Sequence, residues 1–225
     1  IMKNWYQLTE SETLDKLGVT SEGLSSQQAD SLLEKHGKNV LEESKKKSVF
    51  QVFLSQFADL MVIILIIAAI VSMFSGSVES TIVIFAVITL NAILGTVQHI
   101  KAEKSLESLK SLSSPSAKVI RDGRKIEIDS ENIVPGDIVV LEAGDLVVAD
   151  GRIINNYSLQ VNESSLTGES TNIDKSVGTI EKEVPLADRT DMVFSGSLVT
   201  YGRAIVVVTE TGMNTEIGKI ATLMN

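Results

Sequence analysis

The sequence of 225 residues has no cysteine, three prolines and two histidines. Without cysteine the chain has neither disulfides nor thiolate metal ligands. His36 and His99 alone make a histidine-built zinc site an unfavourable interpretation. Any metal that matters to this chain would need oxygen ligands.

Positive charge is also scarce. The chain has 20 Lys and Arg against 29 Asp and Glu, a net charge of −9, and the acidic residues are scattered. This balance argues against nucleic acid as a partner. With 44% hydrophobic and 22% charged residues, the composition is typical of ordered structure with a buried core, in one large or two small domains.

Charge nearly disappears from residues 48–100, where Asp59 and Glu79 are the only Asp, Glu, Lys or Arg. Two apolar runs lie in this stretch, at about 52–74 and 79–98. Each is long enough for a membrane-crossing helix, which needs about 20 residues. The "SGS" between them is a turn signal. We therefore predict a transmembrane helical hairpin, with a buried helix pair in a soluble core as the alternative.

Lysines flank the two apolar runs, and the loop between the runs has no Lys or Arg; these lysines are Lys45, Lys46 and Lys47 before the first run and Lys101, Lys104 and Lys110 after the second. The positive-inside rule then places both ends of the chain in the cytoplasm, in an integral membrane protein. The second helix is predicted to continue as a stalk over 101–114, because an apolar stripe persists there without Gly or Pro. A surface helix after a break at Gly95 is the alternative.

The periodicity changes beyond the stalk. Over residues 115–213, short strand-like runs alternate with Gly and Asp turns, and "RDGR" is a hairpin signal. This pattern predicts a small mainly-β domain. Residues 214–225 follow as a helix that Asn214 or Thr215 caps.

The N-terminal segment, residues 1–47, contains two short helical patterns. The second is opened by Ser25 or Ser26 and ended by Gly37. We expect a cytoplasmic helical segment here.

Within the predicted β domain, "SSLTGES" at 164–170 holds the carboxylate of Glu169 on a turn of small residues. Functional side chains often lie on such loops, which a rigid scaffold carries. The tripeptide Thr-Gly-Glu alone is weak evidence, because it arises by chance in many proteins. Its context decides its meaning.

Segments along the whole chain share one order: "NAILGTVQ", "KAEKSLESLK", "VPGDIVVLEAGD", "ADGRII", "NESSLTGES", "VFSGSLVTYGRA" and "TGMNTEIGKIA". Together they resemble the N-terminal part of type II P-type cation-transporting ATPases, and within these the bacterial calcium pumps. The resemblance implies a membrane α-helical hairpin plus a small mainly-β cytoplasmic actuator domain, a distorted jelly roll with N-terminal and terminal helices. It also implies that residues 1–47 belong to the actuator and that 214–225 link it to a third membrane helix.

For the loop, the resemblance implies catalysis. Glu169 would orient a water molecule and accept its proton during hydrolysis of an aspartyl phosphate, Thr167 and Gly168 would shape the loop, and Ser170 would support it. Asp59, at the start of the first apolar run, could lie on an ion path or simply face water at the membrane interface.

The family's phosphorylation motif, Asp-Lys-Thr-Gly-Thr, does not occur in these 225 residues. The resemblance therefore implies a longer polypeptide that binds ATP and Mg²⁺ through its other domains, with neither bound by this chain alone. The implied partners are those phosphorylation and nucleotide-binding domains, the remaining membrane helices, the lipid bilayer of a bacterial plasma membrane, and a transported cation. Calcium is the expected cation, with sodium, proton or magnesium as alternatives.

Four residues at three places depart from the family pattern. Asn162 stands where Asp is usual, Val148 where Pro is frequent, and Thr171-Asn172 where Val-Pro is frequent. Proline restricts the unfolded chain and Asn162 lacks the charge of Asp, so these changes put the rigidity of the loop in question. The alternative function is a free-standing membrane-tethered regulatory or binding module without catalysis, but the intact Thr-Gly-Glu loop favours the pump.

Overall fold

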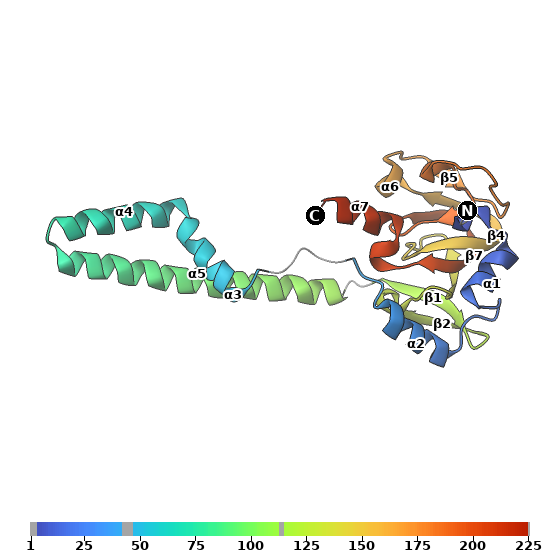
Figure 1. Cartoon of the computed structure of the whole chain (residues 1–225), viewed down its shortest axis with the longest axis horizontal. Coiled ribbons are helices and arrows are strands. Elements are labelled where there is room, and N and C mark those ends of the chain that lie inside the picture. Colours follow the sequence, from blue (N-terminus) through green and yellow to red (C-terminus); the bar gives the residue numbers. More distant parts are fainter. Residues whose placement is uncertain (1–3, 42–46, 113–114, 225) are drawn as a thin grey trace. The chain divides into compact units, whose positions relative to one another are not determined.

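A computed structural model describes residues 4–41, 47–112 and 115–224. The chain divides into two compact units: residues 1–42 with 114–225, which we call the β unit, and residues 43–113, which we call the helical unit. Figure 1 shows both units along the chain. Lys45 and Lys46, used above for orientation, and the end of the predicted stalk at 113–114 lie outside the described residues.

The helical unit contains α3 (Val49–Ser55), η2 (Gln56–Ala58), α4 (Leu60–Phe74) and α5 (Val78–Leu112). A single first helix over about 52–74 was the wrong expectation, because the segments before and after Asp59 meet at an angle of 69°. The cause is local. Asp59 has an extended backbone (ψ 136°), and its carboxylate accepts a hydrogen bond from the N–H of Met61 at 2.9 Å, so it caps a new helix.

The last helix of this unit, α5, continues for 35 residues and passes Gly95 without a break. A Cβ atom at Gly95 would lie 2.3 Å from the side-chain oxygen of Gln56, so a larger residue here would require the end of the Gln56 side chain to move. Small residues also line the contact between α4 and α5, where Ala69 and Ala92 are buried. Gly76, with φ 78°, lies in the turn between the two helices.

Part of α5, Val78–Leu106, is long and apolar enough to cross a membrane, and the bent pair α3/η2 and α4 gives a second span if it is counted as one. These counts refer to the part of the chain that the structure describes. Most large apolar side chains of these helices are exposed within the unit, including Phe74 at 89%. Such a surface is compatible with lipid and unfavourable in water.

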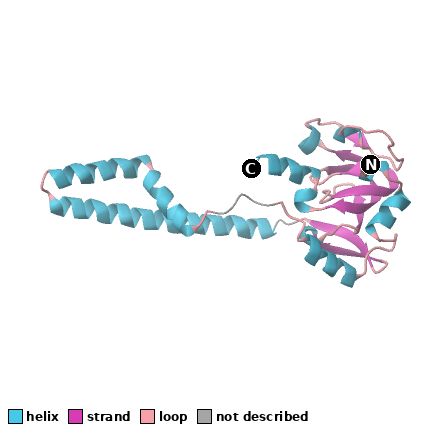
Figure 2. Cartoon of the chain, viewed as in Figure 1, coloured by secondary structure: helices cyan, strands magenta, loops and turns pink. Residues whose placement is uncertain are grey.

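The β unit is built on strands that Figure 2 shows in magenta. In the described residues one seven-stranded antiparallel sheet has the order β2-β1-β3-β7-β4-β5, with β6 paired to β4. Its strands are β1 (Ser116–Arg121), β2 (Arg124–Asp129), β3 (Ile138–Glu142), β4 (Asp150–Asn162), β5 (Asn172–Asp174), β6 (Met192–Val193) and β7 (Leu198–Glu210). Asp122 (φ 51°) and Gly123 (φ 68°) form the left-handed turn that the Asp-Gly signal predicts between β1 and β2.

Short helices complete the β unit: η1 (Trp5–Gln7), α1 (Glu10–Leu17), α2 (Ser26–His36), η3 (Ser130–Asn132), α6 (Ser164–Thr167), η4 (Leu186–Asp188), η5 (Gly212–Asn214) and α7 (Glu216–Met224). Ser25 caps α2, and Gly37 ends it. The hydroxyl of Thr215 accepts the N–H of Gly218 at 3.1 Å and so caps α7. The predicted fold class, a helical hairpin with a mainly-β domain and N-terminal and terminal helices, is confirmed.

Three buried apolar clusters lie in the described part of the β unit; the smallest contains Phe194, and the two larger ones fix the sheet. The larger is made by the inward residues of β1, β3, β4 and β7, among them Val119, Ile153 and Val206. In the second, Leu24 and Ala29 pack against Ile138 and Val207 of the sheet. The N-terminal helical segment and the sheet therefore share one core.

A cation is also buried in this unit. Arg152 of β4 is 0% exposed, and its guanidinium donates to the carbonyl oxygens of Leu8 (3.3 Å), Ile153 (2.9 Å), Val177 (2.9 Å) and Asp191 (3.2 Å). Its Nε also lies 3.2 Å from the Asp191 carboxylate, which is equally buried. Arg152 thus links the N-terminal segment, β4 and two loops through the hydrogen bonds of one side chain.

Candidate functional site

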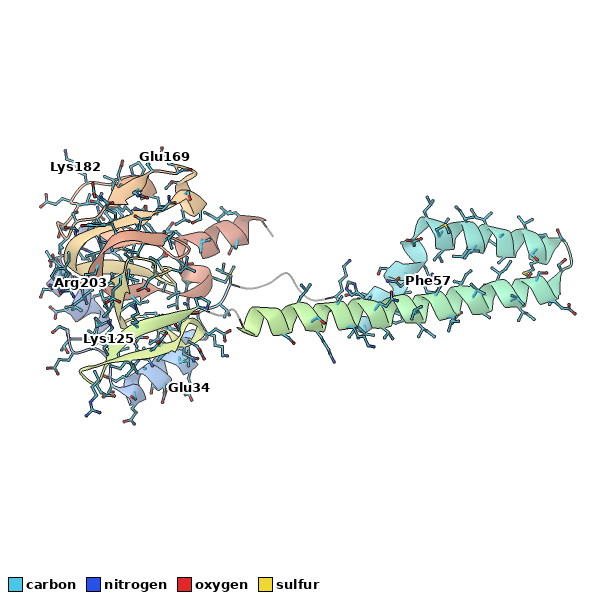
Figure 3. All side chains as sticks on the ribbon, turned by 180° about the vertical axis from the view of Figure 1, so that it is seen from behind. Glu34, Phe57, Lys125, Glu169, Lys182 and Arg203 are labelled. Carbon is cyan, nitrogen blue, oxygen red and sulfur yellow. The ribbon has the colours of Figure 1, made fainter. Side chains whose placement is uncertain are left out.

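The loop at 163–171 connects two paired strands at an edge of the sheet. Asn162 of β4 faces Asn172 of β5, and Val161 faces Ile173, in antiparallel register. Figure 3 shows Glu169 at the periphery of the β unit, on this loop. The sheet therefore holds both ends of the loop and leaves its tip on the surface.

Gly168 gives the tip its shape. The single helical turn α6 ends when the N–H of Gly168 donates to the carbonyl of Ser164 at 3.0 Å, and Gly168 itself is left-handed with φ 76°. A Cβ atom at this position would meet nothing within 4 Å, so glycine is needed for its backbone conformation rather than for space. This conformation turns the chain outward just before Glu169.

Thr167 carries the hydrogen bonds that hold the tip. Its hydroxyl donates to the carbonyl of Glu163 at 3.2 Å and accepts the N–H of Glu169 at 3.3 Å. The Glu169 side chain is exposed, and no hydrogen bond or ion pair engages its carboxylate among the residues that the structure describes. The loop thus presents an accessible carboxylate on a backbone that is fixed from below.

Asn162 closes the loop. Its side-chain oxygen accepts the N–H of Ser164 at 3.1 Å, and its side-chain nitrogen donates to the carbonyl of Ser170 at 3.3 Å. An aspartate could make the first bond but not the second, because an ionised carboxylate only accepts. The departure at Asn162 therefore adds a bond across the loop, and Ser170 takes part through its backbone.

Sequence reasoning missed two charged residues at the base of the loop, Glu163 and Lys175. Both side chains are 0% exposed, and the carboxylate lies 2.5 Å from the ammonium. The strand period contains the signal that identifies Glu163: Leu159 and Val161 alternate inward along β4, and Glu163, one residue beyond its end, continues the alternation and is also buried. Burial raises the pKa of Glu163 and lowers that of Lys175, while their mutual attraction opposes both changes.

A second loop, 194–197, supports the first from the side. The hydroxyl of Ser165 donates to the carbonyl of Gly196 at 3.1 Å. A Cβ atom at Gly196 would lie 3.3 Å from Ile217 of α7 and 3.5 Å from the Ser165 hydroxyl. Gly196 is therefore enclosed between α6 and α7, and both helices contact the same residue.

Asp150 joins this second loop to α7. One carboxylate oxygen accepts the N–H of Ser195 at 2.8 Å, and the other accepts the N–H of Glu216, the first residue of α7, at 2.7 Å. The side chain is nearly fully buried, and burial raises its pKa to about 6 even though both N–H groups, and Lys219, favour the ionised form. Glu216 opposes ionisation.

This raised pKa predicts a particular pH dependence of stability. Because the folded pKa of Asp150 exceeds its ordinary value of 3.8, the native state holds this proton more tightly, and its contribution to the unfolding free energy falls as the pH rises from about 4 through about 6. In Asp150→Asn this contribution is absent. The unfolding free energy of the parent minus that of the variant should therefore decrease between pH 4 and pH 7, as measured by urea unfolding followed by Trp5 fluorescence. A difference that stays constant or increases with pH would show that the two N–H donors dominate over burial.

The other predicted site residue, Asp59, belongs to the helical unit, where it is exposed and caps α4. In the described part of the chain, no group of three or more His, Cys, Asp or Glu side chains could hold a metal ion. The 163–171 loop thus offers an exposed carboxylate, that of Glu169, on a fixed backbone.

Comparison with known families assigns these features. Residues 111–225 match the model described as the P-type ATPase actuator domain, and residues 5–72 match the model described as the N-terminus of cation transporter ATPases. The chain belongs to the P-type ATPase family. The loop with Glu169 lies in the part of the chain that matches the actuator domain.

Relatives of known description are similar over nearly the whole chain. A calcium-transporting ATPase of Listeria monocytogenes is 48% identical over 219 residues, which is 97% of this chain and 25% of the relative. Calcium-transporting ATPase 1 of Bacillus cereus is 44% identical over 100% of this chain and 26% of the relative. A cation-transporting ATPase of Synechocystis is 40% identical over 92% of this chain and 22% of the relative. The chain thus spans about a quarter of the length of these P-type ATPases and corresponds to their N-terminal region.

Proposed function

We propose that this chain is the N-terminal part of an ATP-driven P-type calcium pump and that its Thr-Gly-Glu loop hydrolyses the pump's aspartyl phosphate. The observation that carries the proposal is the loop itself: an exposed carboxylate, Glu169, whose backbone is fixed through Thr167 and Asn162. A module that only binds or regulates needs no such group. The proposal extends the family assignment to a step of the reaction cycle.

In the proposed step, Glu169 holds a water molecule in line with the bond between phosphorus and the aspartyl oxygen. The water oxygen attacks phosphorus, Glu169 accepts the water proton, and the bond to the aspartyl oxygen breaks to release phosphate and a free carboxylate. The left-handed Gly168 lets the backbone at the tip approach the phosphoryl group without a side chain in between. Because an exposed carboxylate repels a phosphate, the loop has to reach it only at this step of the cycle.

The proposed polypeptide supplies the parts that this chain lacks. We assign ATP and Mg²⁺ to the phosphorylation and nucleotide-binding domains of the longer protein, because this chain spans only about a quarter of the length of its P-type ATPase relatives. The helical unit is proposed to cross a bacterial plasma membrane twice, with the N-terminus and the β unit in the cytoplasm. Calcium is proposed as the cargo because several relatives are described as calcium-transporting ATPases.

Two measurements test this function. In membranes that contain the longer polypeptide, micromolar Ca²⁺ should produce an acid-stable phosphoenzyme from ATP, whereas sodium alone should not. The 225-residue chain by itself should show no ATPase activity. If the phosphoenzyme forms in response to sodium, sodium would replace calcium as the proposed cargo. ATP turnover by the isolated chain would contradict the assignment of ATP to other domains of the longer protein.

An antibody against the β unit distinguishes the pump from the free-standing module. In native membranes it should detect a polypeptide several times larger than this chain. A band at the size of 225 residues would favour the module.

A further inference from the structure

The buried pair Glu163–Lys175 brackets the catalytic loop. Glu163 directly precedes α6, and Lys175 directly follows β5, so the two residues are the first and last fixed points around the loop. Their charged atoms lie 2.5 Å apart with both side chains 0% exposed. Apart from each other, these charged atoms have no hydrogen-bond partner in the described residues.

The side chains around the ion pair are apolar, apart from one further carboxylate that acts on it from a distance. The Lys175 ammonium lies 5.5 Å from the centre of the Phe194 ring, and Leu166 of α6 packs in the same cluster as Phe194. Asp191 is the further carboxylate that acts on Lys175 electrostatically. The pair therefore lies buried in largely apolar surroundings.

Stability does not explain such a pair. Taking two charges out of water costs about as much as their attraction returns, and apolar residues of similar volume often stabilise a protein equally well or better. A buried ion pair does impose a specific geometry, because the cost of separating the charges is large. Because the pair lies at the base of the loop, the geometry that it fixes is that of the loop.

The backbone of Glu163 transmits the constraint to the tip. Its carbonyl accepts the N–H of Leu166 at 2.9 Å, the N–H of Thr167 at 3.0 Å and the Thr167 hydroxyl at 3.2 Å. The Thr167 hydroxyl in turn accepts the N–H of Glu169. A continuous series of contacts thus connects the Lys175 ammonium to the backbone of Glu169.

We propose that the Glu163–Lys175 ion pair positions Glu169 for water attack by fixing the two ends of the loop relative to each other. The inference rests on the proposed dephosphorylation function and adds two positioning residues to it. Neither Glu163 nor Lys175 contacts the phosphoryl group in this scheme. Their effect passes through Glu169.

The test uses the full-length pump and two rates, phosphoenzyme formation from ATP and phosphoenzyme breakdown after the ATP is removed. Glu163→Gln should slow breakdown about tenfold or more, since a small misplacement of a catalytic group has effects of this size, while formation stays within about twofold. Glu131→Gln is the matched control, because its partner Lys38 lies on the surface at 61% exposure. It should leave both rates unchanged.

A second background separates positioning from a structural role. In Glu169→Gln, the further change Glu163→Gln should have little additional effect on breakdown, because residues that act as a unit are not additive. The full tenfold effect in that background would overturn the proposal. Unchanged breakdown in the Glu163→Gln single variant would overturn it as well.

The single variant leaves Lys175 buried without its partner, so it can lower the amount of folded pump. The double variant E163Q/K175M removes both charges and keeps the test valid, with folding judged by phosphoenzyme formed per amount of protein. Breakdown at the parent rate in this folded double variant would overturn the proposal. If instead Glu169→Gln itself leaves breakdown unchanged, the proposed function fails first, and the two failures are distinguishable.

Discussion

Replacing Glu169 by glutamine in the full-length pump is expected to preserve phosphoenzyme formation and to slow its breakdown by about 10² or more. Glutamine keeps the size of the side chain and can still hold a water molecule, but it cannot accept a proton at neutral pH. Loss of a general base has effects of about 10²–10⁴ on the step that it serves. The measurement is the decay of labelled phosphoenzyme after a chase with unlabelled ATP.

Glu169→Gln is a suitable test because the Glu169 side chain is exposed and its carboxylate has no hydrogen-bond or ion-pair partner among the described residues. The backbone contact of Glu169 with Thr167 does not depend on the side chain. Folding should therefore be unaffected, and a lower breakdown rate reports on chemistry. Glu183→Gln, the same change at another exposed glutamate of the β unit, is the control and should decay at the parent rate. Equal decay of Glu169→Gln and the parent would remove Glu169 from the mechanism.

Local signals in the sequence predicted much of the β unit. The Asp-Gly turn between β1 and β2, the serine cap of α2 and its terminal Gly37 each follow from backbone preferences of single residues. Such preferences act over a few residues, so they can be read without knowing the rest of the fold. The Thr-Gly-Glu loop was singled out because it holds a carboxylate on a turn of small residues, and only the resemblance to a family gave it an expected role.

The break at Asp59 shows where composition misleads. The apolar run around it is continuous enough to suggest one helix, yet a carboxylate with an extended backbone starts a new one and bends the segment by 69°. Hydropathy measures how apolar a window is and does not register a capping side chain. Read as a helix N-cap, Asp59 predicts the break.

The support of the loop could not be derived from neighbours in sequence. Gly196 and Asp150 reach the loop and α7 only because β4 and β7 bring distant segments together. Glu163 is an intermediate case. Its inward position follows from the alternation along β4, whereas its partner Lys175 becomes evident only from the pairing of β4 with β5.

Replacing Arg152 by methionine is expected to destabilise the β unit by about 3–5 kcal/mol, which is the usual cost of removing one partner from a buried charge pair. The change leaves the Asp191 carboxylate, 0% exposed, without its cation, and it removes the donor from the carbonyls of Leu8, Ile153, Val177 and Asp191. Native domains are stable by only about 5–15 kcal/mol in total, so the loss is a large share. Urea unfolding of the chain in detergent, followed by the fluorescence of its one tryptophan, Trp5 in the β unit, measures it.

The control is Arg203→Met, since Arg203 is exposed and its guanidinium stacks on the Tyr157 ring at 4.5 Å. This change should cost no more than about 1 kcal/mol. A loss of similar size in both variants would mean that burial of Arg152 carries no special weight.

The pH dependence of the Arg152→Met loss identifies its cause. Burial already raises the pKa of Asp191 to about 6, with Arg152 acting against the rise. Without Arg152 the folded pKa lies higher still, so the native state gains from holding the proton, and that gain is lost as the pH rises. The loss of stability should therefore be smaller at pH 5 than at pH 8, and Asp191→Leu added to Arg152→Met should recover part of it at pH 8. If the loss of stability is the same at pH 5 and pH 8, it comes from the four carbonyl contacts rather than from the unpaired carboxylate of Asp191. The hydrogen bonds of Arg152 to the loops would then matter more than its buried charge.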